Sequence, residues 1–502
     1  MKHITLFGAG KSATVLIEYL IRQAQHQQWQ ISIVDQNEDL VRSKIGQSKF
    51  AKAVSLDIKQ EKQRKELISS SDLIISLLPP TLHYIVAEDC LEFGKHLLTA
   101  SYVDAKILNL RAEVAQKNVL FLCEMGLDPG IDHMSAMQIV HRIKKEGGKV
   151  TSFKSHCGGL VAPESDDNPW HYKISWNPRN IVLAGKDGAV YREHGATRKL
   201  GYDDLFREKR LIEIGEDSVL SWYPNRDSMN YVPIYELDEA DTFVRTTLRH
   251  PDFIYGWKNI IELKLTDTTP EYTFEEEISL ASFFKLHFEK NGFSDWVKEK
   301  MINRFSQTKD MLEKLMKLME VEEEAEKQGQ EFPDQVMMVD EKGKLNDIHV
   351  EEVKENAAAV VAMQMHEANL TLKQLFFLGM DDKSTMIPKG TYSAADIMQI
   401  ALEKKLALKS DEKDMVVMVH EIEYETGGQK RSVVSSMIVK GENNLHTAMA
   451  KTVGLPLGIA ARLILNGTIR LTGLHIPIVP EIYEPILDEL RKEGIVFNER
   501  EK

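Results

Sequence analysis

The sequence has 502 residues, of which 43% are hydrophobic and 28% are charged, and its formal net charge is −14. This balance is typical of a globular protein of two or three domains, and the negative charge argues against nucleic acid or an anionic membrane as a partner. No apolar run reaches the ~20 residues of a membrane-spanning helix, and Met1–Phe7 does not have the form of a signal peptide. Three dispersed cysteines without zinc-ligand spacing predict reduced thiols, a cytoplasmic location and no metal.

The first 125 residues alternate short apolar runs with helical patterns, and a helix is predicted over Lys11–Gln25. The predicted strands are His3–Phe7, Gln30–Val34, Ala53–Leu56, Leu73–Leu78, His96–Thr99 and Val119–Cys123. Apolar strands separated by helices indicate a parallel sheet that is covered on both faces. Residues 1–125 are therefore predicted to form a Rossmann domain.

The rest of the chain predicts an α/β fold with a second α/β domain and a mainly helical insertion. Residues 126–280 and 411–444 are assigned to a substrate and dimerisation domain, 281–410 to the insertion, and 445–502 to a segment that packs back on the first domain. The further predicted elements are strands at Val150–Lys154 and Ile260–Leu265, a hairpin of Met415–Tyr424 and Ser432–Val439 around Gly427-Gly428, and helices at Leu445–Leu465, interrupted near Gly454–Gly458, and at Ile486–Lys492. The hairpin and the insertion suggest a homodimer.

A glycine-rich turn follows the first predicted strand and opens the first helix. Its residues, Gly8, Ala9, Gly10, Lys11, Ser12 and Ala13, form a G-x-G-x-x-A sequence. Gly8 permits the tight turn, Gly10 lets a pyrophosphate approach the backbone, and Ala13 lets the helix pack on the strand. The amides at the start of the helix then face the phosphates, so the turn predicts a dinucleotide site.

Asp35 ends the second predicted strand, where a carboxylate usually bonds the adenosine ribose. A 2′-phosphate would meet a like charge there, so the sequence favours NAD over NADP, although Arg42 and Lys44 lie near enough in sequence to accommodate NADP. Leu78 ends the fourth predicted strand and Pro79 stops it, and both are expected to border the nicotinamide.

Polar and glycine-containing clusters occur after the fifth and sixth strands and in the second domain. They are Thr99–Tyr102, Glu124–His133, His156–Glu164, Asn168–Trp176, Tyr223–Ser228 and Arg245–Arg249. Together with the glycine-rich turn, the strings GLDPGIDHM, CGGL with APE, and PNRDS closely resemble the glutamate-forming saccharopine dehydrogenase family. The resemblance covers about residues 1–270 and resumes at Leu445–Ile476, whereas 290–410 matches poorly. The chain departs from the family's usual residues at His156, Val161, Ile174 and His250.

The resemblance implies an oxidoreductase that oxidises the secondary amine of saccharopine, an amino-acid-like small molecule, to an imine that water opens to glutamate and 2-aminoadipate 6-semialdehyde, or the reverse. A substrate with three carboxylates needs guanidinium partners, and Arg226 and Arg249 are the candidates. Ser101 and Tyr102 could bond substrate or coenzyme through their hydroxyls, and Cys157 and Gly158 could offer backbone amides.

The general acid or base is left open among Asp128, Lys173 and His133. Asp128 could instead hold the substrate ammonium. Two alternative functions also stay open: a related amine or imine oxidoreductase, such as a carboxylated-polyamine dehydrogenase, and a catalytically inactive cofactor-binding scaffold.

Overall fold

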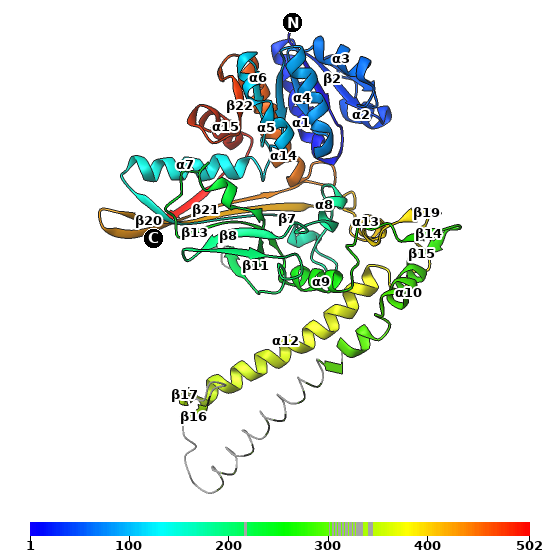
Figure 1. Ribbon diagram of the computed structural model, residues 1–502, viewed down its shortest axis with the longest axis vertical. Helices are drawn as coiled ribbons and strands as arrows, with labels where there is room; N and C mark the ends of the chain where they lie inside the picture. Colours follow the sequence, from blue (N-terminus) through cyan, green and yellow to red (C-terminus); the bar gives the residue numbers. More distant parts are fainter. Residues whose placement is uncertain are drawn as a thin grey trace. The chain divides into compact units, whose positions relative to one another are not determined.

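The computed structural model describes residues 1–214, 218–300, 335–339 and 345–501, together with scattered positions between 302 and 327. These residues form two compact units, each described by itself below (Figure 1). The first unit comprises 1–167, 171–254 and 406–502, and the second comprises 168–170 and 255–405.

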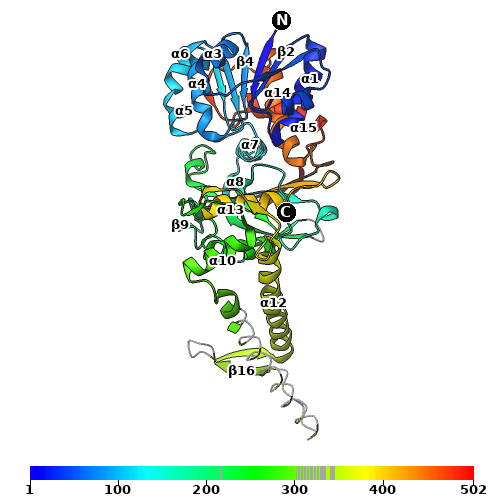
Figure 2. The same ribbon diagram turned by 90° about the vertical axis from the view of Figure 1, so that its right-hand side faces the viewer.

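The first unit contains a parallel sheet built mainly from the N-terminal part of the chain (Figure 2). Its strands are β1 (His3–Phe7), β2 (Gln30–Asp35), β3 (Ala51–Ser55), β4 (Leu73–Ser76), β5 (His96–Thr99), β6 (Leu120–Leu122) and β22 (Gly473–His475). They lie in the order β22-β6-β5-β4-β1-β2-β3, and each neighbouring pair is parallel. The strand order reverses between β1 and β4, and ligands of such sheets bind where this reversal occurs.

Helices cover both faces of this sheet, as the apolar strands predicted. They are α1 (Thr14–Gln27), which follows a short 3₁₀ turn at Lys11–Ala13, α2 (Glu38–Ile45), α3 (Glu61–Ser69), α4 (His83–Glu92), α5 (Ala105–Asn109), α6 (Arg111–Gln116), α14 (Ala448–Leu465) and α15 (Pro480–Lys492). Along β1, Ile4 and Leu6 belong to one buried cluster, and Phe7 belongs to another. Alternate side chains of one strand therefore fill cores on opposite sides of the sheet.

The predicted interruption near Gly454–Gly458 is wrong, because α14 runs continuously through both glycines. They are instead points of close packing against α1. A Cβ on Gly454 would lie 3.0 Å from the Leu16 backbone nitrogen, and one on Gly458 would lie 2.6 Å from the Tyr19 ring. By length and composition α14 could cross a membrane, but 72% of it is buried inside the protein, as is usual for a core helix.

A mixed sheet forms the other half of the first unit. Its strands are β7 (Lys149–Val161), β8 (Ala189–Glu193), β9 (Ala196–Leu200), β10 (Leu211–Ile214), β11 (Ser218–Pro224), β12 (Arg226–Asp227), β13 (Thr242–Arg249), β20 (Asp414–Thr426), β21 (Gln429–Lys440) and β23 (Asn498–Glu501). The main path is β10-β11-β13-β7-β20-β21-β23. Helix α7 (Ile131–Lys145) packs on β7 and β20 and also contacts α15, whereas α8 is the short segment Pro178–Val182 (Figure 1).

The predicted hairpin is confirmed as β20 and β21. Gly427 and Gly428 form its turn with φ of +56° and +75°, the left-handed conformation that a two-residue hairpin turn requires. The α/β fold class is likewise confirmed, whereas the exact domain limits stay a prediction. Strand β22 joins the parallel sheet, but β23 pairs with β21 of the mixed sheet.

The second unit is mainly helical. It contains most of α9 (Pro251–Glu262), α10 (Leu280–Asn291), α12 (Val350–Phe377) and α13 (Ala394–Lys405), and the short strands β14 (Tyr272–Phe274), β15 (Ile278–Ser279), β16 (Gln335–Val339), β17 (Leu345–His349), β18 (Met386–Ile387) and β19 (Gly390–Tyr392). The predicted strand Ile260–Leu265 is wrong, because its first residues end α9. Trp257, Ile260 and Ile261 are all buried, and this spacing belongs to a helix face.

Candidate active site

The glycine-rich turn connects β1 to α1 at the point where the strand order reverses. Gly8 has φ of +99°, and its amide donates a 2.8 Å hydrogen bond to the Val34 carbonyl. A Cβ at Gly8 would lie 2.7 Å from the Leu77 carbonyl oxygen, which belongs to the segment after β4. Backbone conformation and close packing therefore both require glycine at this position.

Gly10 serves a different purpose. Its φ is −63°, which any residue adopts, and a Cβ placed on it would meet no atom within 4 Å. The space in front of Gly10 is therefore open, as the approach of a pyrophosphate requires. Lys11 is exposed, Ser12 is half-buried, and Ala13 is buried beneath the start of the helix. These residues fit a dinucleotide.

Asp35 is tied to this turn by its carboxylate. One oxygen accepts a 2.8 Å hydrogen bond from the Ala9 amide, and the other accepts a 3.1 Å hydrogen bond from the Asn37 amide. Lys44 reaches back from α2 and donates a 2.7 Å hydrogen bond to the Gly10 carbonyl. Burial lowers the pKa of Lys44 to about 8, although Asp35 acts to raise it. A cation thus stands beside the carboxylate at the predicted ribose position.

A chain of hydrogen bonds joins the ends of β4 and β5. The Ser76 hydroxyl contacts His83 Nδ1 at 2.8 Å, and His83 Nε2 contacts the Ser101 hydroxyl at 2.8 Å. Burial lowers the pKa of His83 to about 4, so its ring is neutral at physiological pH. Leu78 is half-buried and Pro79 is exposed, both just after β4.

A charged cluster lies next to the ends of β5 and β6. Arg245 Nη2, from β13, donates hydrogen bonds of 2.7 Å to both Asp128 Oδ1 and Asp132 Oδ2. The Tyr102 hydroxyl donates to Asp128 Oδ1 at 3.0 Å and accepts a hydrogen bond from Arg245 at 3.2 Å. Asp132 also accepts a 2.6 Å hydrogen bond from the Gly130 amide. Three segments far apart in sequence thus meet at one guanidinium.

The two carboxyl groups of this cluster differ in proton affinity. Burial and the neighbouring charge of Asp132 raise the pKa of Asp128, although Arg245 acts to lower it. Burial acts to raise the pKa of Asp132 as well, but the charges of His133 and Arg245 outweigh burial and lower it. When two such groups have pKa values pushed apart, the one with the higher value is the candidate for proton transfer. That group is Asp128, which is also the more accessible one, with 15% of its side chain exposed against 1% for Asp132.

The two predicted carboxylate clamps lie in different surroundings. Arg226 is exposed, and its guanidinium lies 5.2 Å from the centre of the Tyr102 ring, so it borders the charged cluster. Arg249 is buried, donates a 2.7 Å hydrogen bond to the Leu248 carbonyl, and lies over the Tyr172 ring at 5.1 Å. Its Nε atom is buried and has no hydrogen-bond partner among the described residues.

Cys157 and Gly158 lie on β7 beside β13. Burial raises the pKa of the Cys157 thiol well above its usual range, and the charges of Asp128 and Asp132 raise it further. A thiol with a raised pKa is a poor nucleophile. A Cβ on Gly158 would lie 2.5 Å from the Leu248 carbonyl oxygen, so the missing side chain lets β13 approach.

His133 lies in the interior, next to Asp132. Its Nε2 contacts Glu124 at 2.7 Å, its Nδ1 contacts the Tyr235 hydroxyl at 2.5 Å, and its ring is fully buried. Glu124 also accepts a 3.1 Å hydrogen bond from the Tyr231 hydroxyl. With both ring nitrogens engaged, His133 suits the positioning of this cluster better than proton transfer to a substrate.

Lys173 is not joined to the charged cluster by any contact among the described residues. It is 4% exposed and pairs with Glu412 and, at 2.8 Å, with Asp167. The hydrogen bonds from Lys173 and Lys409 lower the pKa of Asp167 to about 2. The geometry favours a structural ion pair for Lys173, and its predicted role as an acid or base stays a prediction.

Two family models match the chain. One is described as the saccharopine dehydrogenase NADP binding domain and covers residues 4–122, and the other is described as the saccharopine dehydrogenase C-terminal domain and covers residues 126–495. The chain belongs to the saccharopine dehydrogenase family. The second match extends through 290–410, which the motifs alone had left outside the resemblance.

Relatives that match nearly the whole of this chain agree with this family membership. The chain is 30% identical to the saccharopine dehydrogenase [NADP(+), L-glutamate-forming] of Schizosaccharomyces pombe, over 99% of both chains. It is 31% identical to the mitochondrial alpha-aminoadipic semialdehyde synthase of Mus musculus, over 99% of this chain and 47% of the mouse protein. The structure of apo histidine-tagged saccharopine dehydrogenase (L-Glu forming) from Saccharomyces cerevisiae matches with a TM-score of 0.78 and 25% identity, over 100% of both chains.

The comparisons give no support to the preference for NAD. The matched domain model and the fungal relatives are named for NADP. Membership of the family therefore supports a nicotinamide dinucleotide site but not a preference for NAD.

Arg245 and Asp132 were not among the site residues predicted from the sequence, although both lie within the motifs that resemble the saccharopine dehydrogenase family. A strand signal was present, because Arg245, Thr247 and Arg249 alternate along β13 and alternate residues share a face. Asp132 was not recognised as a site residue because an aspartate at the start of a helix is usually a helix-capping residue.

Proposed function

We propose that this chain is an NADP-dependent, glutamate-forming saccharopine dehydrogenase. The observation that carries the proposal is the charged cluster of Tyr102, Asp128, Asp132 and Arg245 in a chain whose Gly8–Ala13 turn fits a dinucleotide. The family membership and the names of the full-length relatives support the same reaction.

The reaction oxidises the C–H bond next to the secondary amine of saccharopine. NADP⁺, when bound, accepts the hydride and becomes NADPH, and the substrate is left as an imine. One water then adds to the imine carbon, and the resulting carbinolamine breaks its C–N bond to give glutamate and 2-aminoadipate 6-semialdehyde. One proton is released overall, so a group that accepts and returns protons accelerates the sequence.

Asp128 is the residue proposed to move these protons. Its raised pKa makes it a stronger base than an ordinary aspartate, and the Tyr102 hydroxyl and Arg245 hold the same carboxylate oxygen in place. As the anion, Asp128 takes the proton from the substrate ammonium, because only a neutral amine can lose hydride. After Asp128 has passed that proton to solvent, its carboxylate takes a proton from the attacking water and returns one to the departing amine.

Arg226 and Arg249 are proposed to bind substrate carboxylates. Arg226 is exposed next to Tyr102, so it can accept a ligand without losing an existing ion pair among the described contacts. Arg249 has a buried Nε donor with no hydrogen-bond partner in the described part of the chain, and a ligand carboxylate would satisfy it. A carboxylated polyamine would lack one of the carboxylates, so the two arginine variants separate this alternative from saccharopine.

The coenzyme is proposed to be NADP. Both carboxylate oxygens of Asp35 already accept hydrogen bonds from backbone amides, which reduces their availability to ribose hydroxyls. Lys44 adds a positive charge next to Gly10 and Asp35, and this charge would favour a 2′-phosphate.

We further propose a homodimer in the cytoplasm, without nucleic acid or membrane partners. The net charge of −14 supports the last part, since no basic excess is available to bind phosphate polymers. Light scattering that gives one chain per particle would contradict the dimer.

A nicotinamide absorbance assay tests the proposed function. The chain is incubated with saccharopine and NADP⁺, with saccharopine and NAD⁺, and with each coenzyme alone, and glutamate is measured in the same samples. We expect NADPH and glutamate in equal amounts and a higher kcat/KM with NADP⁺. Absence of turnover in a preparation that binds NADP⁺ would contradict the proposal and favour the inactive scaffold.

A further inference from the structure

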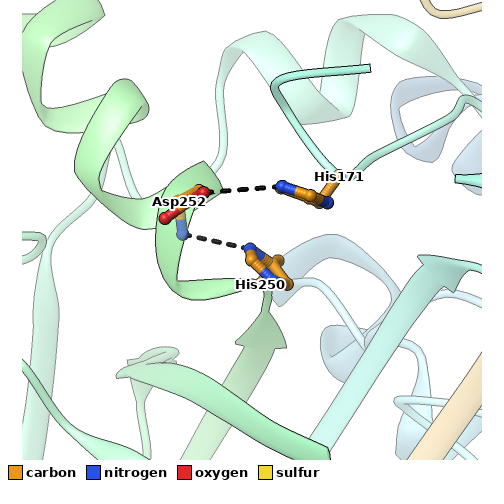
Figure 3. A group of neighbouring side chains, drawn as sticks. All are labelled: His171, His250 and Asp252. Atoms are coloured by element: carbon orange, nitrogen blue, oxygen red, sulfur yellow. Dashed lines mark hydrogen bonds and ion pairs between the residues drawn. The ribbon is translucent and has the colours of Figure 1, made fainter. Parts of the chain in front are cut away.

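His171, His250 and Asp252 form a group of candidate metal ligands outside the charged cluster (Figure 3). His171 follows the loop that carries Asp166. His250 directly follows β13, and Asp252 lies in the first turn of α9. One ligand atom from each residue lies within 4.8 Å of the others. All three side chains are half-buried, so an ion and a water ligand could reach them.

We propose that these three side chains bind one divalent transition-metal ion of the zinc class. The donor set is two imidazoles and one carboxylate, which zinc and similar ions prefer over calcium or magnesium. His171 Nε2 lies 3.4 Å from Asp252 Oδ2. A tetrahedral zinc ion with bonds of ~2.0–2.1 Å separates its ligand atoms by about 3.3 Å, so this pair is already spaced as one edge of the tetrahedron.

Asp166 completes the arrangement from behind His171. Its Oδ2 contacts His171 Nδ1 at 2.5 Å, which directs the other ring nitrogen, Nε2, toward Asp252. A carboxylate behind a histidine ligand orients the ring and makes it a stronger donor, as in many zinc sites. Asp166 Oδ1 is buried without a hydrogen-bond partner among the described residues, so the negative charge next to the histidines is only partly compensated.

The existing contacts show what an ion would replace. The His171 ring lies between two carboxylates, Asp166 at Nδ1 and Asp252 at Nε2, and an ion bound at Nε2 would lie between His171 and Asp252. The two imidazole rings stack at 3.9 Å with an angle of 29° between their planes, and the Asp252 amide donates to His250 Nδ1 at 3.2 Å. Coordination would turn His250 out of this stack and exchange that long hydrogen bond for a metal bond.

The backbone at His171 is consistent with a specific demand on its side chain. Its φ of +47° lies in the left-handed region, which costs a residue other than glycine on the order of 1 kcal/mol. The proposed ion would join the segment around residue 171 to the start of α9 within the first unit. The inference does not depend on the proposed dehydrogenase activity.

The test uses the untagged full-length chain and ZnCl₂ in isothermal titration calorimetry, with CoCl₂ as a spectroscopic probe. We expect one Zn²⁺ per chain and intense visible bands of tetrahedral Co²⁺. His250→Phe keeps an aromatic ring but removes the ligand, Asp252→Asn removes the charge, and His171→Asn keeps a residue that tolerates the left-handed backbone. Each of these three ligand variants should weaken Zn²⁺ binding at least about tenfold. Asp166→Asn, which leaves the ligands in place but removes the carboxylate behind His171, should weaken Zn²⁺ binding by about 10-fold.

His194→Asn is the matched control. His194 is an exposed histidine with φ of +49° that lies in the turn between β8 and β9, away from the proposed ligands in sequence. It should leave the stoichiometry and affinity unchanged. Absence of Zn²⁺ binding to the wild-type chain, or equal binding by the wild type and the three ligand variants, would overturn the proposal. Circular dichroism of each variant separates loss of a ligand from loss of the fold.

Discussion

The two halves of the candidate active site differ in the groups that form them: one consists of backbone and the other of side chains. The dinucleotide turn is local and consists of backbone, with Gly8 fitted against Leu77 and Gly10 facing open space. The charged cluster is made of side chains from segments far apart in sequence, since Tyr102 follows β5, Asp128 follows β6, and Arg245 lies on β13. A backbone site depends on shape, whereas a side-chain site depends on charges that balance one another.

This difference predicts different consequences of mutation. A change in the turn alters either the fold or coenzyme binding, depending on whether the new side chain meets protein or open space. A change in the charged cluster alters proton transfer and local charge, because Arg245 serves two carboxylates that compete for it.

The largest expected effect belongs to Asp128→Asn. Loss of a general acid or base typically lowers a rate by about 10²–10⁴-fold, so kcat for saccharopine oxidation should fall by that factor. Because the turn is separate, NADP⁺ affinity measured by fluorescence titration should be unchanged. Asp227→Asn, which changes an exposed carboxylate whose oxygen bonds the Met229 amide, is the matched control and should retain activity.

The pH dependence sharpens this prediction. Saccharopine oxidation needs Asp128 as the anion, so kcat/KM should fall as the pH drops through the pKa of Asp128, which burial and Asp132 raise above the ordinary value. The acid limb should therefore lie at higher pH than an exposed aspartate would give. An Asp128→Asn enzyme that kept this limb would contradict the assignment.

Substitution of the two glycines of the turn should affect different properties, coenzyme affinity for Gly10 and stability for Gly8. Gly10→Val places its side chain in open space, so the thermal midpoint should hardly change, but lost phosphate contacts should weaken NADP⁺ binding by about 100-fold. Gly8→Ala should instead destabilise the apo protein by about 2 kcal/mol, because φ is +99° and the Cβ meets Leu77. Equal effects of both variants on stability would contradict this division of roles.

Arg226→Ala should raise the KM for saccharopine by about 10-fold, the value of one charge-assisted hydrogen bond of ~1.5 kcal/mol. Because Arg226 is exposed, its removal should change the free energy of unfolding by less than about 0.5 kcal/mol. Steady-state kinetics and thermal melts measure both quantities. An unchanged KM would remove Arg226 from the substrate site and favour a substrate with fewer carboxylates.

The smallest expected effect belongs to Lys44→Ala, which should raise the KM for NADP⁺ by about 3- to 5-fold and leave that for NAD⁺ unchanged. In the wild type, this preference for NADP⁺ should decline as the pH rises through about 8, where free Lys44 loses its proton. The same loss of preference with and without Lys44 would show that another group recognises the coenzyme.

The sequence predicted the parallel sheet well because its signals are local. Alternating apolar runs gave β1 and β5 their observed bounds, and the G-x-G-x-x-A turn lies where the strand order reverses. The incorrect predictions share one cause. Ile260–Leu265 and Gly454–Gly458 have residue types that fit two local structures, and the packing around them decides between the two.

The candidate site was predictable residue by residue but not as a network. The motifs supplied Tyr102, Asp128 and Arg226. In the structure Asp128 accepts a hydrogen bond from the Tyr102 hydroxyl, and the Arg226 guanidinium lies near the Tyr102 ring. Arg245 was passed over, and Lys173 was chosen although it pairs with Asp167 and Glu412. Which charge neutralises which depends on contacts between strand β13 and the segments that follow β5 and β6, and no single segment reveals them.

A crystal structure of the chain with NADPH and saccharopine bound together tests the central claim most directly, because these two reduced ligands cannot react with each other. The account predicts the pyrophosphate against the Gly8–Lys11 turn, the substrate amine within hydrogen-bonding distance of Asp128, and carboxylates on Arg226 and Arg249. A pyrophosphate bound elsewhere, or an amine that contacts neither Asp128 nor Tyr102, would contradict it.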